Sequence, residues 1–414
     1  MKHGVVIVGT GHAGVQAAAS LRDEGFDGRV TLVGEERDFP YHKPPLSKTF
    51  IKDADAKPQM LRGEAFYANG AIELRLGERV EKIDLAGRRL DLSSGGHIAF
   101  DRVILATGSR PRALVFPGSG LAGVLSLRSI ADARAIRAAS AGVEDVAILG
   151  GGFIGLEIAA TLAAGGRRVT VVEAQDRLLG RAVAPEIAGH VRQRLEASGI
   201  RILTQTTIDQ LAGGSGRVTG VVTSAGERLP AGLVIVGIGV VPNVELAEAA
   251  GMTIANGIRV DAQMRGSQPE ILAIGDNASY RHWLTGTDMR LESVQNATEQ
   301  AKLAARTIVG RSDAYASVPW FWSDIGDIKL QMVGLAVHGD GIVMAGDPGG
   351  NRFSIFHYRG DGLIAIDSVN RPADHMLGRK MLEAGFSPSP EMVAADDLKA
   401  AFTRWRELQP ADPA

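Results

Sequence analysis

Cysteine is absent from this chain of 414 residues. Without a thiol there can be no disulfide scaffold, no thiolate zinc site, no cysteine nucleophile and no dithiol that relays electrons. Long apolar runs are also missing, and none approaches the ~18 residues needed to span a bilayer. No excess of one charge exists either, because 45 Lys and Arg residues stand against 47 Asp and Glu residues. The net charge of −2 argues against bulk electrostatic binding to nucleic acid or to an anionic membrane.

The chain is too long for one ordinary hydrophobic core, so two or three domains are expected. Its content of 45% hydrophobic and 22% charged residues is typical of a soluble globular protein. The start of the chain does not resemble a secretory signal, because the apolar stretch Val5–Val8 that follows Lys2 is too short. We therefore expect a cytoplasmic protein.

One pattern occurs twice in the sequence. A short apolar strand leads into G-x-G-x-x-G at Gly9–Gly14 and again at Gly150–Gly155. A helical pattern and a second buried strand follow each copy, which is the order of a βαβ unit. Two copies in this context are far more specific than a lone glycine fingerprint.

The glycines of this motif have separate tasks. The first permits a tight turn, the second lets backbone N–H groups approach a pyrophosphate, and the third packs the helix against the strand. The positive end of the helix then faces the phosphates. The two copies predict two bound dinucleotides, or one dinucleotide and one evolutionary relic.

An acidic residue after the second strand of such a unit binds a ribose hydroxyl. Glu173 has this position in the second copy. In the first copy Gly34 stands there instead, which leaves Glu35 or Glu36 as the ribose ligand. A solvent-exposed acid at the end of a strand is the alternative interpretation for Glu35 and Glu173.

Further apolar strands end in small residues, as expected near a cofactor. They lie at residues 101–108, 232–239 and 270–276, and the last ends on Asp276. From about Val318, aromatic residues and short strands predict a smaller α+β domain. Its expected elements are strands at 328–333, 341–345 and 353–358, a helix at 373–384, and a frayed tail after Pro410. The predicted fold is α/β, with two Rossmann-like dinucleotide-binding domains and this smaller α+β domain.

Several longer motifs occur in a recognisable order. They are Gly9–Gly14, Tyr41–Lys48 (YHKPPLSK), Ala106–Pro111, Gly150–Glu157, Ala273–Asp276 and Val318–Asp324 (VPWFWSD). Together they resemble the FAD-dependent NADH:ferredoxin reductases of the putidaredoxin reductase type, over essentially the whole chain. The resemblance implies a glutathione-reductase-like fold. Its domains would be a discontinuous FAD domain at 1–107 and 240–317, an NAD domain at 108–239 and a C-terminal domain at 318–414.

The resemblance also implies binding residues for both dinucleotides. The expected FAD contacts are Gly9, Gly11, Ala13, Gly14, Glu35, Lys43, Lys48, Val80, Ala106, Thr107, Gly108, Arg128, Asp276, Val294 and Trp320. The expected NAD contacts are Gly150, Gly152, Ile154, Gly155, Glu173 and Gly239. The family more often has Arg where this chain has Lys43, and lysine cannot make a bidentate phosphate contact. Asp276 is alternatively, or in addition, a helix N-cap.

Three residues are expected to be catalytic. Lys48 would stabilise negative charge at the flavin edge, and Glu157 would pair with Lys48 beside the nicotinamide. Glu157 is alternatively an acid favoured in the first turn of its helix. Trp320 is expected near the flavin, although tryptophans are more often core residues. The nine histidines show no metal-ligand spacing, so no metal site is expected.

The implied activity is hydride transfer from NADH to FAD, followed by single-electron transfer to two 2Fe-2S ferredoxins. These would serve a haem monooxygenase or a ring-hydroxylating dioxygenase. Three alternatives remain open: a rubredoxin reductase, a cysteine-free NADH oxidase and an apoptosis-inducing-factor-like switch protein. We expect a monomer or weak dimer. Residues 318–414 carry a net charge of −4, so any basic docking patch must be local. The candidates are Arg281, Arg290, Lys302, Arg311, Lys329 and Lys380.

Overall fold

The computed structural model describes residues 4–180, 182–311, 313–395 and 397–408, so Lys2 and the tail after Pro410 lie outside it. The chain forms two compact units. Unit 1 consists of Met1–His42, Lys57–Arg110 and Val240–Ser317, and unit 2 of Lys43–Ala56, Pro111–Gly239 and Val318–Ala414. The segment Lys43–Ala56 thus groups with unit 2. The three expected domain boundaries stay a prediction.

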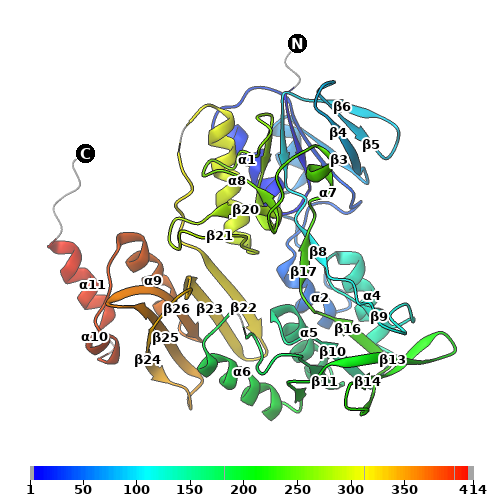
Figure 1. The fold of residues 1–414 in the computed structure, drawn as a ribbon, viewed down its shortest axis with the longest axis vertical. Coiled ribbons are helices and arrows are strands. Elements are labelled where there is room, and N and C mark those ends of the chain that lie inside the picture. The colour runs from blue at the N-terminus through cyan, green and yellow to red at the C-terminus, as the bar shows by residue number, and fades with distance from the viewer. Residues whose placement is uncertain (1–3, 181, 312, 396, 409–414) are drawn as a thin grey trace. The chain divides into compact units, whose positions relative to one another are not determined.

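Unit 1 is built on a parallel sheet of order β19-β7-β1-β2-β3. Its strands are β1 (Val5–Val8), β2 (Val30–Gly34), β3 (Ile72–Leu76), β7 (Arg102–Leu105) and β19 (Ile271–Ala273). All four residues of β1 are buried because strands on both sides and helices on the faces cover it. Helices α1 (His12–Asp23) and α8 (Val294–Ile308) pack side by side, as Figure 1 shows.

Smaller elements complete unit 1. The antiparallel sheet β4-β5-β6 consists of β4 (Val80–Asp84), β5 (Arg89–Leu92) and β6 (His97–Ala99). A second small sheet contains β18 (Ile258–Arg259), β20 (Ala278–Arg281) and β21 (Asp288–Met289). The helices are α3 (Glu64–Asn69), α7 (Glu245–Ala249) and the 3-10 turn η2 (Gly275–Asn277). Strands β8 (Ser109–Pro111) and β17 (Val240–Pro242) form a two-stranded ladder.

Unit 2 repeats the parallel architecture, in the order β12-β11-β10-β16-β9. Its strands are β9 (Val124–Leu125), β10 (Asp145–Leu149), β11 (Arg168–Val172), β12 (Arg201–Leu203) and β16 (Leu233–Val236). Its helices are η1 (Pro44–Ser47), α2 (Thr49–Lys52), α4 (Ile130–Ser140), α5 (Phe153–Ala164) and α6 (Pro185–Ala197). An antiparallel sheet of β13 (Ile208–Gly214), β14 (Arg217–Thr223) and β15 (Arg228–Pro230) packs beside it.

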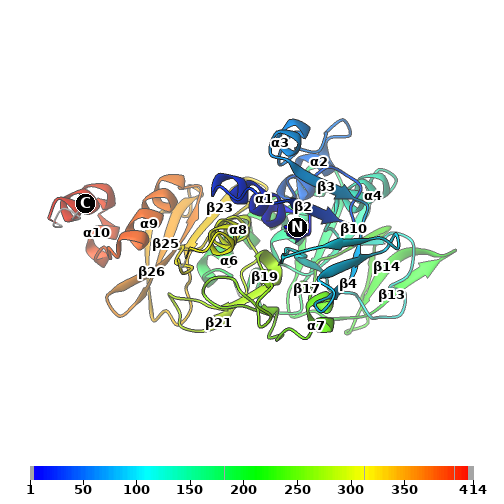
Figure 2. The same ribbon diagram turned by 90° about the horizontal axis from the view of Figure 1, so that it is seen from above.

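The C-terminal part of unit 2 is an antiparallel sheet of order β22-β23-β26-β25-β24. Its strands are β22 (Trp320–Ile325), β23 (Ile328–Gly334), β24 (Gly341–Asp347), β25 (Arg352–Arg359) and β26 (Gly362–Val369). Helix α9 (Pro372–Ala384) packs on β23 and β26, and α10 (Pro390–Ala394) and α11 (Leu398–Glu407) follow, as Figure 2 shows from above. Sequence patterns indicated three of these five strands. They missed β26 and the strand character of the tryptophan motif in β22.

The predicted fold class is confirmed: two Rossmann-like sheets and a smaller α+β part are all present. No helix in the described ranges has the length and apolarity required to cross a membrane.

Candidate functional site

The first glycine loop lies between β1 and α1. Gly9 has φ +118°, and a Cβ there would lie 2.2 Å from the carbonyl oxygen of Ala106. A Cβ on Gly14 would lie 1.8 Å from the carbonyl oxygen of Gly9. Around Gly11, by contrast, no atom lies within 4 Å of the added Cβ. The first and third glycines are therefore required by the fold, whereas Gly11 opens onto space that fits a pyrophosphate.

The second loop repeats this geometry between β10 and α5. Gly150 has φ +104°, and its Cβ would lie 2.4 Å from the carbonyl oxygen of Gly237. A Cβ on Gly155 would lie 2.5 Å from the carbonyl oxygen of Gly150, whereas Gly152 again meets nothing within 4 Å. Ile154 is 43% exposed at the start of α5. The loop and Ile154 present an open surface for a second dinucleotide.

The acids at the ends of the second strands differ between the two copies. Both carboxylate oxygens of Glu173 accept backbone hydrogen bonds, from Gly151 N at 2.6 Å and from Gln175 N at 2.7 Å. In the first copy, Glu36 accepts a hydrogen bond from the Tyr41 hydroxyl. Glu35 is exposed to solvent. The Glu36 carboxylate thus has a protein partner, and the choice of Glu35 or Glu36 as the ribose ligand stays a prediction.

The A-T-G turn after β7 is fixed by two asparagines that the sequence patterns did not reveal. The hydroxyl of Thr107 donates to the carbonyl oxygen of Asn243 at 2.8 Å and accepts from Asn277 Nδ2 at 2.8 Å. The Asn243 amide donates to the carbonyl oxygen of Thr107 at 2.8 Å. Thr107 is thus held by protein groups, so its side chain serves the turn. Gly108 follows with φ +65°, a conformation that favours glycine.

Asp276 lies in the 3-10 turn η2 and accepts a hydrogen bond from the Ser109 hydroxyl at 3.0 Å. Its interpretation as a helix N-cap is wrong. The cap of η2 is Ile274, and α8 is capped by Ser293, whose hydroxyl accepts from Asn296 N. The chain continues from η2 into strand β20 instead of a helix, so no helix begins at Asp276.

The remaining FAD candidates are distributed over both units. Unit 1 contains Gly9, Gly11, Ala13, Gly14, Glu35, Val80, Ala106, Thr107, Gly108, Asp276 and Val294. Unit 2 contains Lys43, Lys48, Arg128 and Trp320. Within unit 2, Lys43 Nζ donates to the carbonyl oxygen of Arg128 at 3.3 Å. The NAD candidates, including Gly239 with φ +99°, all belong to unit 2.

An ion pair between a partly buried lysine and a buried glutamate forms a polar cluster in unit 2. Lys48 Nζ lies 2.8 Å from Glu157 Oε1, with side-chain exposures of 21% and 8%. Ser323 Oγ donates to the same oxygen at 2.6 Å, and Ser47 Oγ donates to Oε2 at 2.5 Å. Lys48 Nζ also donates to the carbonyl oxygen of Pro44 at 3.3 Å. A buried carboxylate needs such donors, because an unpaired charge in a protein interior is costly.

The position of Glu157 on its helix differs from the prediction. Helix α5 begins at Phe153, so Glu157 is its fifth residue and the first turn contains no acid. Interaction with the helix dipole therefore does not explain Glu157, because that interaction fades beyond the first turn. The partners of its carboxylate come from η1 and β22 instead.

Trp320, at the start of β22, lies beside two aromatic rings and an arginine. Its ring centroid is 5.6 Å from that of Trp322 and 5.8 Å from that of His375. Arg379 Cζ lies 4.7 Å from the Trp320 ring centroid, within the range of a cation–π interaction. Trp320 also packs against the C-terminal core. A structural role is therefore visible, and its flavin contact stays a prediction.

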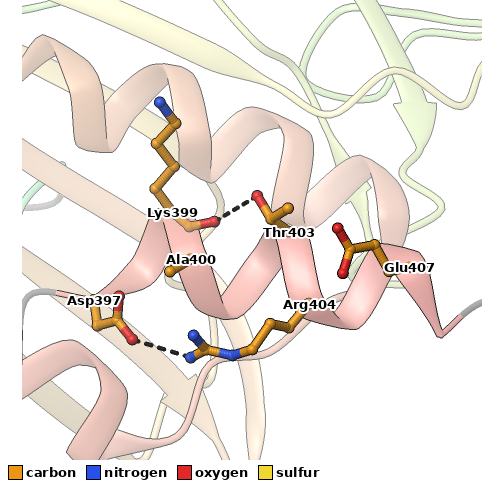
Figure 3. A pocket seen from close by; sticks show the side chains of 6 residues that line it. All are labelled: Asp397, Lys399, Ala400, Thr403, Arg404 and Glu407. Atoms are coloured by element: carbon orange, nitrogen blue, oxygen red, sulfur yellow. Dashed lines mark hydrogen bonds and ion pairs between the residues drawn. The ribbon is translucent and has the colours of Figure 1, made fainter.

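A hollow of about 420 Å³ lies on the C-terminal helix α11, and none of the residues that line it is a predicted site residue. Figure 3 shows that its lining belongs to one face of that helix and the residue before it. Arg404 pairs with Asp397 at 3.0 Å, and Thr403 donates to the carbonyl oxygen of Lys399. These groups satisfy each other, so we assign the hollow no ligand. Within the described ranges, no cluster of three His, Asp or Glu side chains could hold a metal ion.

Comparison with known proteins agrees with this geometry. Residues 3–301 match the family described as pyridine nucleotide-disulphide oxidoreductase. The chain belongs to this family. Residues 320–402 match the reductase C-terminal family. The chain is therefore an FAD-dependent oxidoreductase that uses a pyridine nucleotide, and the two open glycine loops fit these two cofactors.

Three similar proteins cover almost the whole chain. Rhodocoxin reductase of Rhodococcus erythropolis is 41% identical over 97% of this chain and 95% of its own length. The crystal structure of the ferredoxin reductase for the CYP199A2 system of Rhodopseudomonas palustris is 45% identical, with a TM-score of 0.94. It covers 97% of this chain and 100% of its own. The covalent putidaredoxin reductase–putidaredoxin complex is 36% identical, with a TM-score of 0.93, over 97% and 99%.

Proposed function

We propose that the chain is an NADH:ferredoxin oxidoreductase that serves a haem monooxygenase or a ring-hydroxylating dioxygenase. The observation that carries this proposal is the Lys48–Glu157 pair in a chain without cysteine. Disulfide reductases and thiol-based peroxidases on this fold need a cysteine, so both of these classes are excluded. The relative named as the ferredoxin reductase of the CYP199A2 system, and the putidaredoxin reductase–putidaredoxin complex, support a ferredoxin as the electron acceptor.

The residues of the chain supply binding, orientation and charge. The N–H groups around Gly11 and Gly152 bind the two pyrophosphates, because those loops are open and lie at helix N-termini. FAD, when bound by these residues, would supply the hydride-accepting and single-electron-donating chemistry. Lys48 holds a positive charge at the flavin edge, and Glu157 orients it.

The preferred coenzyme is NADH. The carboxylate of Glu173 is anchored at the end of β11 by two backbone N–H groups, where a 2′-phosphate would have to bind. Two arginines that lie near Glu173 in the sequence have other partners. Arg168 pairs with Asp145 at 2.7 Å at the other end of β11, and Arg177 donates to the carbonyl oxygens of Gly180 and Val183.

Basic residues are proposed to contact the ferredoxin, and their contacts within each unit favour three of the six candidates. The Arg290 side chain is only 9% exposed and pairs with Glu292. Lys302 pairs with Glu299 and Arg311 pairs with Glu24. Arg281, Lys329 and Lys380 are exposed. So few charges suit the small, transient interfaces of redox partners.

The test is anaerobic reduction of purified carriers by NADH with the FAD-loaded protein. A 2Fe-2S ferredoxin should be reduced by two equivalents per NADH, and denaturation should release FAD. Preferential reduction of rubredoxin would support the rubredoxin reductase alternative. Rapid oxygen consumption without carrier reduction would identify an NADH oxidase. Very slow flavin reduction by NADH, with no transfer to any carrier, would indicate a switch protein.

A further inference from the structure

The Glu157 carboxylate joins three segments of unit 2 that are distant in the sequence. Ser47 belongs to η1, Glu157 to α5 and Ser323 to β22. In the sequence, Glu157 lies 110 positions from Ser47 and 166 positions from Ser323. Both serines are buried, at 4% and 0% exposure, and Glu157 is 7% exposed. Water therefore cannot replace either hydroxyl cheaply.

Both carboxylate oxygens of Glu157 accept hydrogen bonds. Oε1 accepts from Lys48 Nζ and Ser323 Oγ, and Oε2 accepts from Ser47 Oγ. Lys48 is the charged group that contacts Glu157 among the described residues, and the two serines are its neutral donors.

The position of Ser47 is itself fixed. Thr161, one helical turn after Glu157 on α5, donates its hydroxyl to the Ser47 carbonyl oxygen at 3.0 Å. Ser47 directly precedes Lys48, so the same contact orients the lysine backbone. Helix α5 thus positions both members of the ion pair, since it contains Glu157 and its Thr161 fixes the backbone next to Lys48.

We propose that Ser47 and Ser323 are positioning residues, whose hydroxyls keep Glu157 an oriented carboxylate so that Lys48 remains a fixed ammonium group during flavin reduction. The last part of this inference rests on the proposed function. Neither serine is expected to touch NADH or the flavin. Ser323 gives the tryptophan-rich strand β22 a direct link to the ion pair.

The experiment records the Glu157 carboxylate stretching bands by infrared difference spectroscopy in the full-length FAD-loaded protein, with Glu157→Gln used to isolate them. Loss of one hydrogen bond should move these bands in Ser323→Ala and in Ser47→Ala. Ser354→Ala is the matched control. Ser354 is a buried serine of the same C-terminal sheet that donates to the Asp374 carboxylate at 2.7 Å. That variant should leave the Glu157 bands unchanged.

The second readout is single-turnover flavin reduction by NADH. Both serine variants should retain FAD and reduce it about tenfold more slowly or worse, because misplaced groups lose much of their effect. Unchanged Glu157 bands, or an unchanged rate of flavin reduction, overturns the inference. The infrared measurement needs neither NADH nor a carrier. A wild-type protein that NADH cannot reduce would therefore refute the proposed function without affecting the hydrogen-bond result.

Discussion

Gly152→Ala offers the sharpest test of the second dinucleotide loop. Gly152 is the N-cap of α5, with φ −83° and ψ 174°, a conformation that alanine adopts without strain. Its added Cβ would meet no protein atom within 4 Å. The fold should therefore accept the methyl group, which would occupy the space that we assign to the coenzyme pyrophosphate.

The expected loss can be worked out from the contact that the methyl group would block. A hydrogen bond between a backbone N–H and a charged phosphate contributes about 1.5–3 kcal/mol. At about 1.4 kcal/mol per decade, this corresponds to a dissociation constant about 10- to 140-fold weaker. The free energy of unfolding should fall by about 1 kcal/mol, because alanine is a poorer N-cap than glycine.

Two matched variants separate binding from folding. Gly155→Ala places its Cβ 2.5 Å from a backbone oxygen, so overpacking of about 1–3 kcal/mol should lower thermal stability. Gly189→Ala, on the exposed face of α6 with no atom within 4 Å, should stabilise the helix by up to about 1 kcal/mol. That second variant should bind coenzyme normally.

The assay is equilibrium titration with NAD⁺, followed by tryptophan or flavin fluorescence, together with thermal unfolding by circular dichroism. Gly152→Ala should lose affinity with only this small loss of stability. If it binds NAD⁺ as tightly as the wild type, the pyrophosphate does not approach Gly152 and the assignment of this loop is wrong.

Four further outcomes are expected. Glu173→Ala should narrow the NADH:NADPH ratio of kcat/KM by tenfold or more, because it removes a repulsion of ~4 kcal/mol between the carboxylate and the 2′-phosphate of NADPH, and even half of that energy is more than one decade. Equal use of both coenzymes by the wild type would contradict the assignment. Lys48→Ala should keep FAD but slow its single-turnover reduction by about 100-fold, whereas Lys52→Ala, an exposed neighbour, should not. Burial, followed by Arg379, lowers the pKa of His375 to about 4. As the pH falls, His375 is protonated in the unfolded chain before it is protonated in the folded protein. The free energy of unfolding should therefore fall by up to about 3 kcal/mol between pH 6.5 and 4. Urea titrations of His375→Phe should show a smaller fall. The KM for ferredoxin should rise only gently with ionic strength, because few charge pairs contribute. A KM that does not change with ionic strength would refute the hypothesis that basic residues attract the ferredoxin.

The glycine loops could be predicted from the sequence because the motif has a fixed spacing. Gly9 and Gly14 stand five positions apart, and the same offset recurs at Gly150 and Gly155. The third glycine of each copy is crowded by the first, whereas the first is crowded by Ala106 or Gly237, which are distant in the sequence. The buried strands were recognisable because a parallel strand covered on both faces is apolar throughout.

Choices between neighbouring or similar residues needed the tertiary structure. Glu35 and Glu36 are adjacent acids, and only the hydrogen bond from Tyr41 to Glu36 distinguishes them. Arg168 lies five residues before Glu173, but an extended strand separates their ends by about 3.3 Å per residue. Arg168 therefore pairs with Asp145 instead of modifying the Glu173 site.

The cluster around Glu157 depended most on folding. The resemblance implied its pairing with Lys48, but no sequence pattern connects it with Ser47 or Ser323. Serines are common and tolerated at many positions, so a serine has no recognisable signal until packing excludes water around it. The sequence determined that a carboxylate would stand on α5. The packing of η1 and β22 against that helix decided which hydroxyl groups hold it there.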